Sequence, residues 1–97
     1  MSELDKIKQT LKQNKRDLQQ EFNVKELGIF GSYVRGEQNK NSDVDILVVF
    51  SKMPGIFDYM KVENRLSAIL HKRVDLVMKG ALKPMIGKNI MREVVYV

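Results

Sequence analysis

The chain has 97 residues, of which 43% are hydrophobic and 30% charged, so we expect one small domain over residues 1–97, without the length for a second. It contains no cysteine, which excludes a disulfide framework and a cysteine-based metal site. No apolar run approaches the roughly 20 residues that span a bilayer, so we expect a cytoplasmic protein that does not enter membranes.

The net charge of +5 is unevenly distributed along the chain. Residues 26–50 carry more acidic than basic side chains, whereas the rest of the chain is basic. A basic surface suits a nucleotide triphosphate, an acidic protein partner or RNA. Charge alone, however, favours an ordinary solvated surface.

Residues 2–21 are predicted to form an amphipathic helix, with Ser2 as its N-cap and Asn23 just beyond its end. Its lysines alternate with acidic residues, which favours a solvated face over a nucleic-acid-binding arm. Residues 24–30 are predicted to form a strand, in which Gly28 indicates the close approach of another backbone. The apolar stripe expected to face the core consists of Leu4, Ile7, Leu11, Leu18 and Phe22.

Gly31 and Ser32 follow this strand and are predicted to form a turn. A short helix is expected over residues 33–37, ended at about Gly36. The polar residues 38–42 then form a surface loop.

Residues 43–50 are predicted to form the central strand, because the continuous apolar run from Ile46 to Phe50 indicates burial on both faces. A second long helix is expected over residues 58–72. Its predicted buried stripe consists of Tyr59, Val62, Leu66, Ile69 and Leu70.

Residues 73–78 are predicted to form a third strand, and Pro84 to begin a last helix that ends at about residue 93. The apolar residues 94–97 form either a final strand or an edge that faces a partner. The residues of the last helix expected to point inward are Met85, Ile86 and Ile90.

Two aspartates open the predicted central strand. Side chains alternate between the two faces of a strand, so Asp43 and Asp45 point the same way and Val44 points the other way. Paired carboxylates of this kind suit hard divalent cations, although they could also be solvated acids at a turn. Gly31 and Ser32 could cradle a phosphate at a helix N-terminus, or Ser32 could simply cap the short helix. A phosphate cradle beside a metal site favours phosphoryl or nucleotidyl transfer.

Two further charged residues each allow two interpretations. Asp75 lies within an apolar strand, which is costly unless it binds a cation or pairs with Arg73 or Lys72. With Asp43 and Asp45, it would complete a set of three carboxylates able to hold two Mg²⁺ ions. Arg35 either contacts phosphates or bridges to an acid within the fold.

The stretch from Leu27 to Phe50 resembles a known signature: Gly31-Ser32, ten residues, then Asp43-x-Asp45 followed by apolar residues. It is similar to the nucleotidyltransferase superfamily related to DNA polymerase beta, and the small size is typical of its minimal nucleotidyltransferase (MNT) branch. The resemblance implies an α/β fold with a small mixed sheet flanked by helices. It also implies two Mg²⁺ ions on Asp43 and Asp45, with Asp75 helping to activate the acceptor, and ATP as the substrate.

Minimal members of this family commonly act as antitoxins beside HEPN-domain ribonuclease toxins. The resemblance therefore implies transfer of AMP from ATP to a hydroxyl group, for which a tyrosine of such a partner protein is the expected acceptor. One alternative is modification of a small molecule such as an aminoglycoside, which would need an additional substrate domain. Another is a non-catalytic module that inhibits its partner by occlusion. Direct binding of nucleic acid is not expected.

Overall fold

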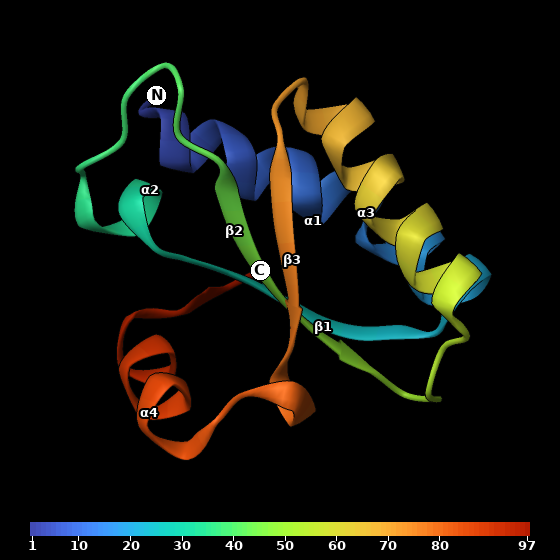
Figure 1. Ribbon diagram of the computed structural model, residues 1–97. Helices are drawn as coiled ribbons and strands as arrows, with labels where there is room; N and C mark the ends of the chain where they lie inside the picture. The colour runs from blue at the N-terminus through green and yellow to red at the C-terminus, as the bar shows by residue number, and fades with distance from the viewer.

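The computed structural model describes residues 1–97 and contains a four-stranded mixed sheet with helices on both faces (Figure 1). The strand order is β3-β2-β1-β4, with β2 and β3 parallel and the other pairs antiparallel. The elements in chain order are α1 (Glu3–Phe22), β1 (Val24–Phe30), α2 (Ser32–Arg35), β2 (Val44–Phe50), α3 (Ile56–Leu70), β3 (Val74–Met78), the 3-10 turn η1 (Lys79–Ala81), α4 (Pro84–Glu93) and β4 (Val95–Tyr96). This is the predicted α/β architecture.

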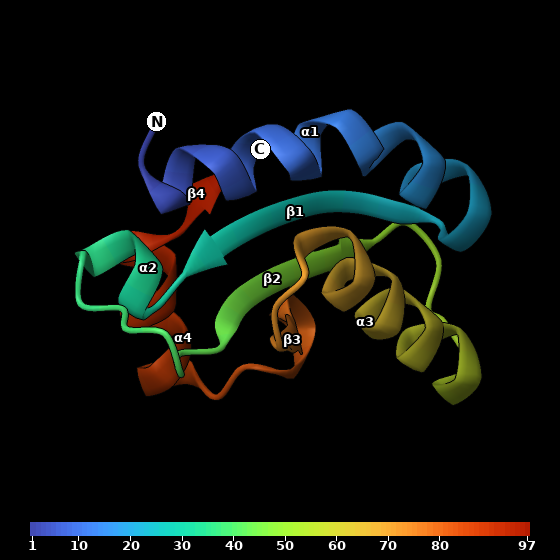
Figure 2. The same cartoon turned by 90° about the horizontal axis from the view of Figure 1, so that it is seen from above.

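The main core lies between the sheet and the layer formed by α1 and α3. Helix α4 lies apart from that layer, on the opposite face of the sheet, as the two ribbon views show (Figures 1 and 2). The predicted stripes of α1 and α3 are confirmed, because each helix contributes three buried residues to this core. The buried residues of these two helices are Ile7, Leu11, Leu18, Val62, Leu66 and Leu70.

A smaller cluster forms where α4 packs on the other face. It contains Phe30, Leu47 and Ile90, so β2 is covered on both sides as predicted. The expectation that Met85 and Ile86 also point inward is wrong, because their side chains are 81% and 55% exposed. Ile90 is the one buried residue of α4, whereas Met85, Ile86 and Met91 of the same helix are exposed.

The ends of the helices and strands predicted from the sequence lie within two residues of the observed ends. The Ser2 hydroxyl accepts a hydrogen bond from the Asp5 N–H at 3.1 Å, which confirms the N-cap of α1. Asn23 ends that helix in the left-handed conformation (φ 60°). Helix α3 begins earlier than predicted, at Ile56, and ends at Leu70 because His71 adopts φ 54°. None of the helices combines the length and the apolar composition that a membrane-spanning segment requires.

The C-terminal residues return to the sheet beside β1. Strand β4 pairs with β1 through Gly28 and Tyr96, which confirms the expected close approach at this glycine and shows that the tail is a strand. A Cβ atom on Gly28 would lie 2.5 Å from a methyl group of Val94. Only glycine therefore lets the chain after α4 lie against β1.

We predict that Gly28→Ala lowers the free energy of unfolding by about 1–3 kcal/mol, because the added methyl group overpacks the contact with Val94. Gly80→Ala is the matched control, since a Cβ there meets no atom within 4 Å. Urea unfolding followed by circular dichroism measures both. Equal stability of the two variants would show that the tail adjusts without cost.

Candidate active site

Asp45 and Asp75 lie side by side on adjacent strands. Each is the second residue of its strand, and the parallel register pairs them directly. Residues in register on neighbouring strands point to the same face, so both carboxylates lie on the α4 side of the sheet. Their neighbours Val44 and Ile46 point the other way and are fully buried in the main core. Asp75 thus shares the face of Asp45.

Asp43 lies just before β2 and forms an ion pair with Arg73. The distance from Asp43 Oδ1 to Arg73 Nε is 3.0 Å, and Arg73 also donates to the Asn41 carbonyl at 3.1 Å. Asp75 forms no ion pair, so the predicted alternative in which it pairs with Arg73 or Lys72 is wrong. In this structure no three histidine, aspartate or glutamate side chains are arranged to hold one metal ion.

The electrostatics of the site are those of crowded carboxylates. Burial, and after it the negative charges of Asp75 and Asp43, raise the pKa of Asp45 to about 6, while Arg35 opposes the shift. Crowded carboxylate oxygens are the hard donors that Mg²⁺ prefers, and a divalent cation would remove this repulsion. The donor set therefore fits the predicted metal in chemistry, provided that Asp43 leaves Arg73.

Gly31 places the turn after β1 directly against the Asp45 carboxylate. Its backbone has φ +82°, and a Cβ atom there would lie 2.0 Å from Asp45 Oδ2. A side chain at this position is excluded both by the backbone conformation and by the contact. The Gly-Ser turn and the aspartates were predicted to lie close together. The structure confirms this for Gly31 and Asp45, which are in contact.

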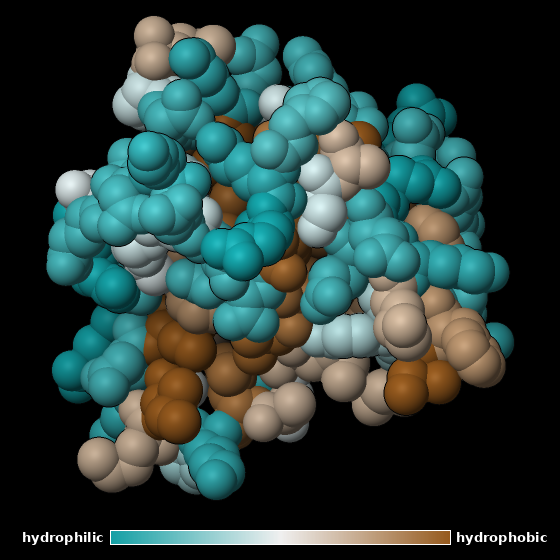
Figure 3. Space-filling view, turned by 45° about the horizontal axis from the view of Figure 1, so that its top comes forward, coloured by the Kyte–Doolittle hydropathy of each residue, from teal (hydrophilic) through white to brown (hydrophobic).

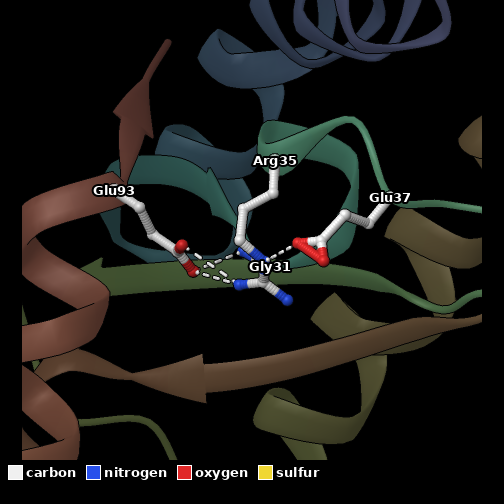
Figure 4. Close-up of polar contacts among 4 residues, drawn as sticks. All are labelled: Gly31, Arg35, Glu37 and Glu93. Atoms are coloured by element: carbon white, nitrogen blue, oxygen red, sulfur yellow. Dashed lines mark hydrogen bonds and ion pairs between the residues drawn. The ribbon is translucent and has the colours of Figure 1, made fainter.

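Glu93, which the sequence did not indicate, connects the end of α4 to this turn (Figure 4). Its Oε1 accepts a hydrogen bond from the Gly31 N–H at 2.8 Å. Arg35 Nη1 donates to both carboxylate oxygens of Glu93, at 3.0 and 3.1 Å, and Arg35 Nε donates to Glu37 at 2.7 Å. These hydrogen bonds to Glu37, and then those to Glu93, raise the already high pKa of Arg35. Of the two interpretations of Arg35, the structure shows the bridge to acids.

Ser32 is the first residue of α2 and not its N-cap. The N-cap position is Gly31, and no side chain caps this helix. The prediction that Ser32 caps this helix is therefore wrong, because Ser32 lies one residue after the N-cap position and its hydroxyl accepts no capping hydrogen bond. Contact between Ser32 and a phosphate stays a prediction.

A shallow pocket of about 350 Å³ lies between the turn, Asp45 and α4. Its lining residues are partly polar and partly apolar. The polar part consists of Gly31, Arg35, Asp45, Asn89 and Glu93, and the apolar part of Phe30, Ile86 and Ile90. Ile86, expected in the core, lines this pocket instead. The space-filling view shows hydrophobic side chains gathered on the lower part of the molecule, toward α4 (Figure 3). The pocket thus joins a charged end to an apolar wall.

The mixed sheet, with two register-paired carboxylates beside a glycine-serine turn, defines a nucleotidyltransferase fold. The chain belongs to the nucleotidyltransferase domain family, whose model matches residues 5–97. It is 50% identical over 97 residues to the protein adenylyltransferase MntA of Thermococcus cleftensis, covering 100% of this chain and 98% of that protein. The resemblance inferred from the Gly-Ser and Asp-x-Asp residues is therefore confirmed.

Solved structures agree with this assignment. A structure described as a minimal nucleotidyltransferase superposes with a TM-score of 0.75 at 26% identity, covering 98% of this chain and 95% of that chain. A toxin-antitoxin structure with AMP-PNP gives a TM-score of 0.70 at 24% identity, covering 99% and 72%. At that identity the second similarity shows the shared fold alone.

We predict that Asp45→Asn stabilises the metal-free protein at pH 7 and that this gain shrinks as the pH falls through about 6. The pKa of Asp45 is raised in the folded state, so folding takes up a proton between about pH 4 and 6. Asp45 therefore destabilises the fold above this window and not below it. Urea unfolding in EDTA at pH 7 and pH 5 measures the change, with the exposed Asp17→Asn as control. A gain that increases on acidification would contradict the raised pKa.

We also predict that Glu93→Ala lowers the free energy of unfolding by about 1–3 kcal/mol, because the partly buried Gly31 N–H loses its acceptor. Glu37→Ala is the matched control, since its contact with Arg35 is an exposed pair worth about 0–1 kcal/mol. Urea unfolding at pH 7 compares the two. Equal losses would show that the Gly31 contact contributes nothing.

Proposed function

We propose that this chain is a protein adenylyltransferase that transfers AMP from ATP to a hydroxyl group of a partner protein. The observation that carries the proposal is the register pairing of Asp45 with Asp75 beside the Gly31 turn. The activity named for the Thermococcus cleftensis relative, which matches the whole chain at 50% identity, supports it. In this proposal residues 1–97 work as one minimal nucleotidyltransferase domain located in the cytoplasm.

Asp43, Asp45 and Asp75 are the proposed ligands of two Mg²⁺ ions. Bound Mg²⁺ supplies charge neutralisation at the triphosphate and lowers the pKa of the accepting hydroxyl. Burial and the charges of Asp75 and Asp43 raise the pKa of Asp45, so added positive charge is most favourable at this carboxylate. Asp75 forms no ion pair in the structure and is free to act on the acceptor side.

Gly31, Ser32 and Arg35 are the proposed contacts of the triphosphate. The Gly31 N–H and the Arg35 guanidinium are both held by Glu93, so a phosphate oxygen must share these donors with Glu93 or displace it. The apolar wall contributed by Ile86 and Ile90 suits the nucleoside end of the same ligand. The polar and apolar lining of the pocket supports ATP as its proposed ligand.

In the proposed reaction, the acceptor oxygen forms a bond to the α-phosphorus of ATP. The bond from this phosphorus to the bridging oxygen breaks, and pyrophosphate leaves. The hydroxyl proton goes to a nearby base, and the carboxylate of Asp75 is the proposed first recipient. One P–O bond forms and one breaks, so the reaction needs neither an oxidant nor a reductant.

A HEPN-type toxin is the proposed partner, and a tyrosine its accepting residue. The relative at 50% identity is called MntA, and crystal structures of MntA–HepT toxin-antitoxin complexes share the fold of this chain. A structure of a tri-AMPylated HEPN toxin of Shewanella oneidensis with its MNT antitoxin also shares the fold, at 19% identity and a TM-score of 0.61. The shared name and fold support this partner class.

We predict that incubation with the product of the adjacent reading frame, ATP and Mg²⁺ adds the mass of one or more AMP groups to that product. Asp43→Asn with Asp45→Asn should lower the rate at least about 100-fold, because the proposed metal ligands are lost. Asp5→Asn with Asp17→Asn makes the same charge change on exposed positions of α1 and serves as the control. Intact-mass spectrometry measures each reaction over time.

Two other outcomes would replace this proposal. Tight binding without covalent change, retained in the double Asn variant, would make the chain an inhibitor by occlusion. Adenylylation of an aminoglycoside in place of the protein would make it a small-molecule enzyme. Modification by the double Asn variant at an unchanged rate would remove the carboxylates from the mechanism.

A further inference from the structure

A carboxylate of the protein itself occupies the anion-binding groups of the pocket beside α4. Glu93 Oε1 accepts hydrogen bonds from the Gly31 N–H at 2.8 Å and from Arg35 Nη1 at 3.0 Å (Figure 4). Its second oxygen, Oε2, accepts from Arg35 Nη1 at 3.1 Å. A backbone N–H beside a guanidinium is a donor set that suits phosphate oxygens. Glu93 therefore binds these two groups as a phosphate oxygen could.

The pocket offers an anion no second basic side chain. Its lining contains one basic side chain, Arg35, and two acidic ones, Asp45 and Glu93. Both acids repel an anion, so a phosphate that enters this pocket needs the guanidinium and the backbone donor. A backbone N–H has only one hydrogen, so an oxygen that binds Gly31 replaces Glu93 there. Arg35 Nε also donates to Glu37 at 2.7 Å, which holds the guanidinium beside the turn when Glu93 leaves.

The position of Glu93 allows its carboxylate to leave and return. Its side chain is 25% exposed, and it is the last residue of α4. The charge of Glu93 is also among those that raise the pKa of Asp45, so the two acids repel each other. Glu93 is thus a partly solvated carboxylate, close to a like charge, that the Gly31 N–H and Arg35 hold in place.

We propose that the Glu93 carboxylate is a built-in competitor of the nucleotide's phosphates. It holds the Gly31 N–H and Arg35 while the pocket is empty, it is displaced when the triphosphate binds, and it returns when pyrophosphate leaves. This inference rests on the proposed function and deepens it, because it assigns control of phosphate affinity to a residue of the C-terminal helix.

The consequence is a lower affinity for every ligand that needs these two donors. An internal competitor weakens the apparent binding of such a ligand according to the fraction of time for which the donors are free. A ligand without phosphate is not affected. Pyrophosphate has no nucleoside to contact Ile86 and Ile90, so its binding depends most on the donors that Glu93 reclaims. Glu93 therefore weakens ATP binding and favours release of the product.

The variant Glu93→Gln tests this competition. Glutamine keeps a side-chain carbonyl that can accept from the Gly31 N–H, but it removes the charge that competes with phosphate. The probes are α,β-methylene-ATP, inorganic pyrophosphate and adenosine, each titrated in Mg²⁺ and followed by nuclear magnetic resonance. We expect the first two to bind the variant about fivefold or more tightly than the unaltered protein, because a charged contact is exchanged for a weaker neutral one. Adenosine binding should change less than about twofold.

Two results of these titrations would overturn the proposal. One is binding of pyrophosphate and the nucleotide analogue that is no tighter in the variant. The other is an equal gain for adenosine, which would show that the substitution reshapes the pocket. Urea unfolding of each variant gives the folded fraction, so that every dissociation constant refers to folded protein.

Glu37→Gln is the matched control variant. It removes the same charge from a partner of the same arginine, but Glu37 does not contact Gly31. Phosphate binding should change less than about twofold in this variant, because the Gly31 N–H is still held by Glu93. Equal gains in the two variants would reduce the effect to loss of negative charge near Arg35 and would overturn competition at Gly31.

The unaltered protein provides a second readout. In ¹³C spectra, the carboxyl signal of Glu93 is the one that disappears in Glu93→Gln. Titration with pyrophosphate should shift this signal and the Gly31 amide signal along the same saturation curve. A shift of the Gly31 amide without a shift of the Glu93 carboxyl would show that phosphate and Glu93 share the donors, and would overturn displacement.

The same experiments separate this inference from the proposed function. Absence of AMP transfer to the product of the adjacent reading frame would remove the proposed function. The pyrophosphate titrations would still decide whether Glu93 competes with phosphate, since they involve no transfer. Conversely, AMP transfer by the unaltered protein, with no tighter phosphate binding in Glu93→Gln, would remove this inference alone.

Discussion

The parallel register of β2 and β3 is the constraint on which the site depends. It sets Asp45 directly beside Asp75, so the backbone holds two like charges together against their mutual repulsion. The strands can hold them because the residues on either side of Asp45 are fully buried and fix β2 in the sheet. A one-residue slip would move Asp45 to the core face, where burial is far more costly. The packing of the core therefore maintains both the burial and the repulsion that raise the pKa of Asp45.

The second constraint comes from the end of the chain. Strand β4 can pair with β1 only because Gly28 has no side chain, and this pairing brings the end of α4 to the Gly31 turn. Glu93 then satisfies the Gly31 N–H and holds Arg35 in place. The contact joins segments 62 residues apart, so the last helix is part of the site although it contributes little to the main core.

The sequence predicted what local rules determine. Alternation along a strand placed Asp43 and Asp45 on one face, helical spacing gave the stripes of α1 and α3, and capping chemistry gave the ends of α1. It failed for Ile86, because spacing shows that a helix has an apolar face but not how much of that face another element covers. It also missed Glu93 and the pairing of Asp43 with Arg73, because each depends on which segments the tertiary fold brings together.

The two arginines of the site each form an ion pair with a neighbouring carboxylate. Arg35 bridges Glu93 and Glu37 beside the Gly31 turn, and Arg73 holds Asp43 just before the start of β2. Each arginine neutralises a carboxylate in the absence of ligands, while Asp45 and Asp75 between them have no such partner within ion-pair distance. A divalent cation would supply the missing positive charge at Asp45 and Asp75, and a phosphate anion would compete with the acids for the two guanidinium groups. Metal and phosphate binding would therefore favour each other. A cation that binds Asp43 frees the Arg73 guanidinium for a phosphate, and a phosphate that binds Arg73 frees the Asp43 carboxylate for a cation.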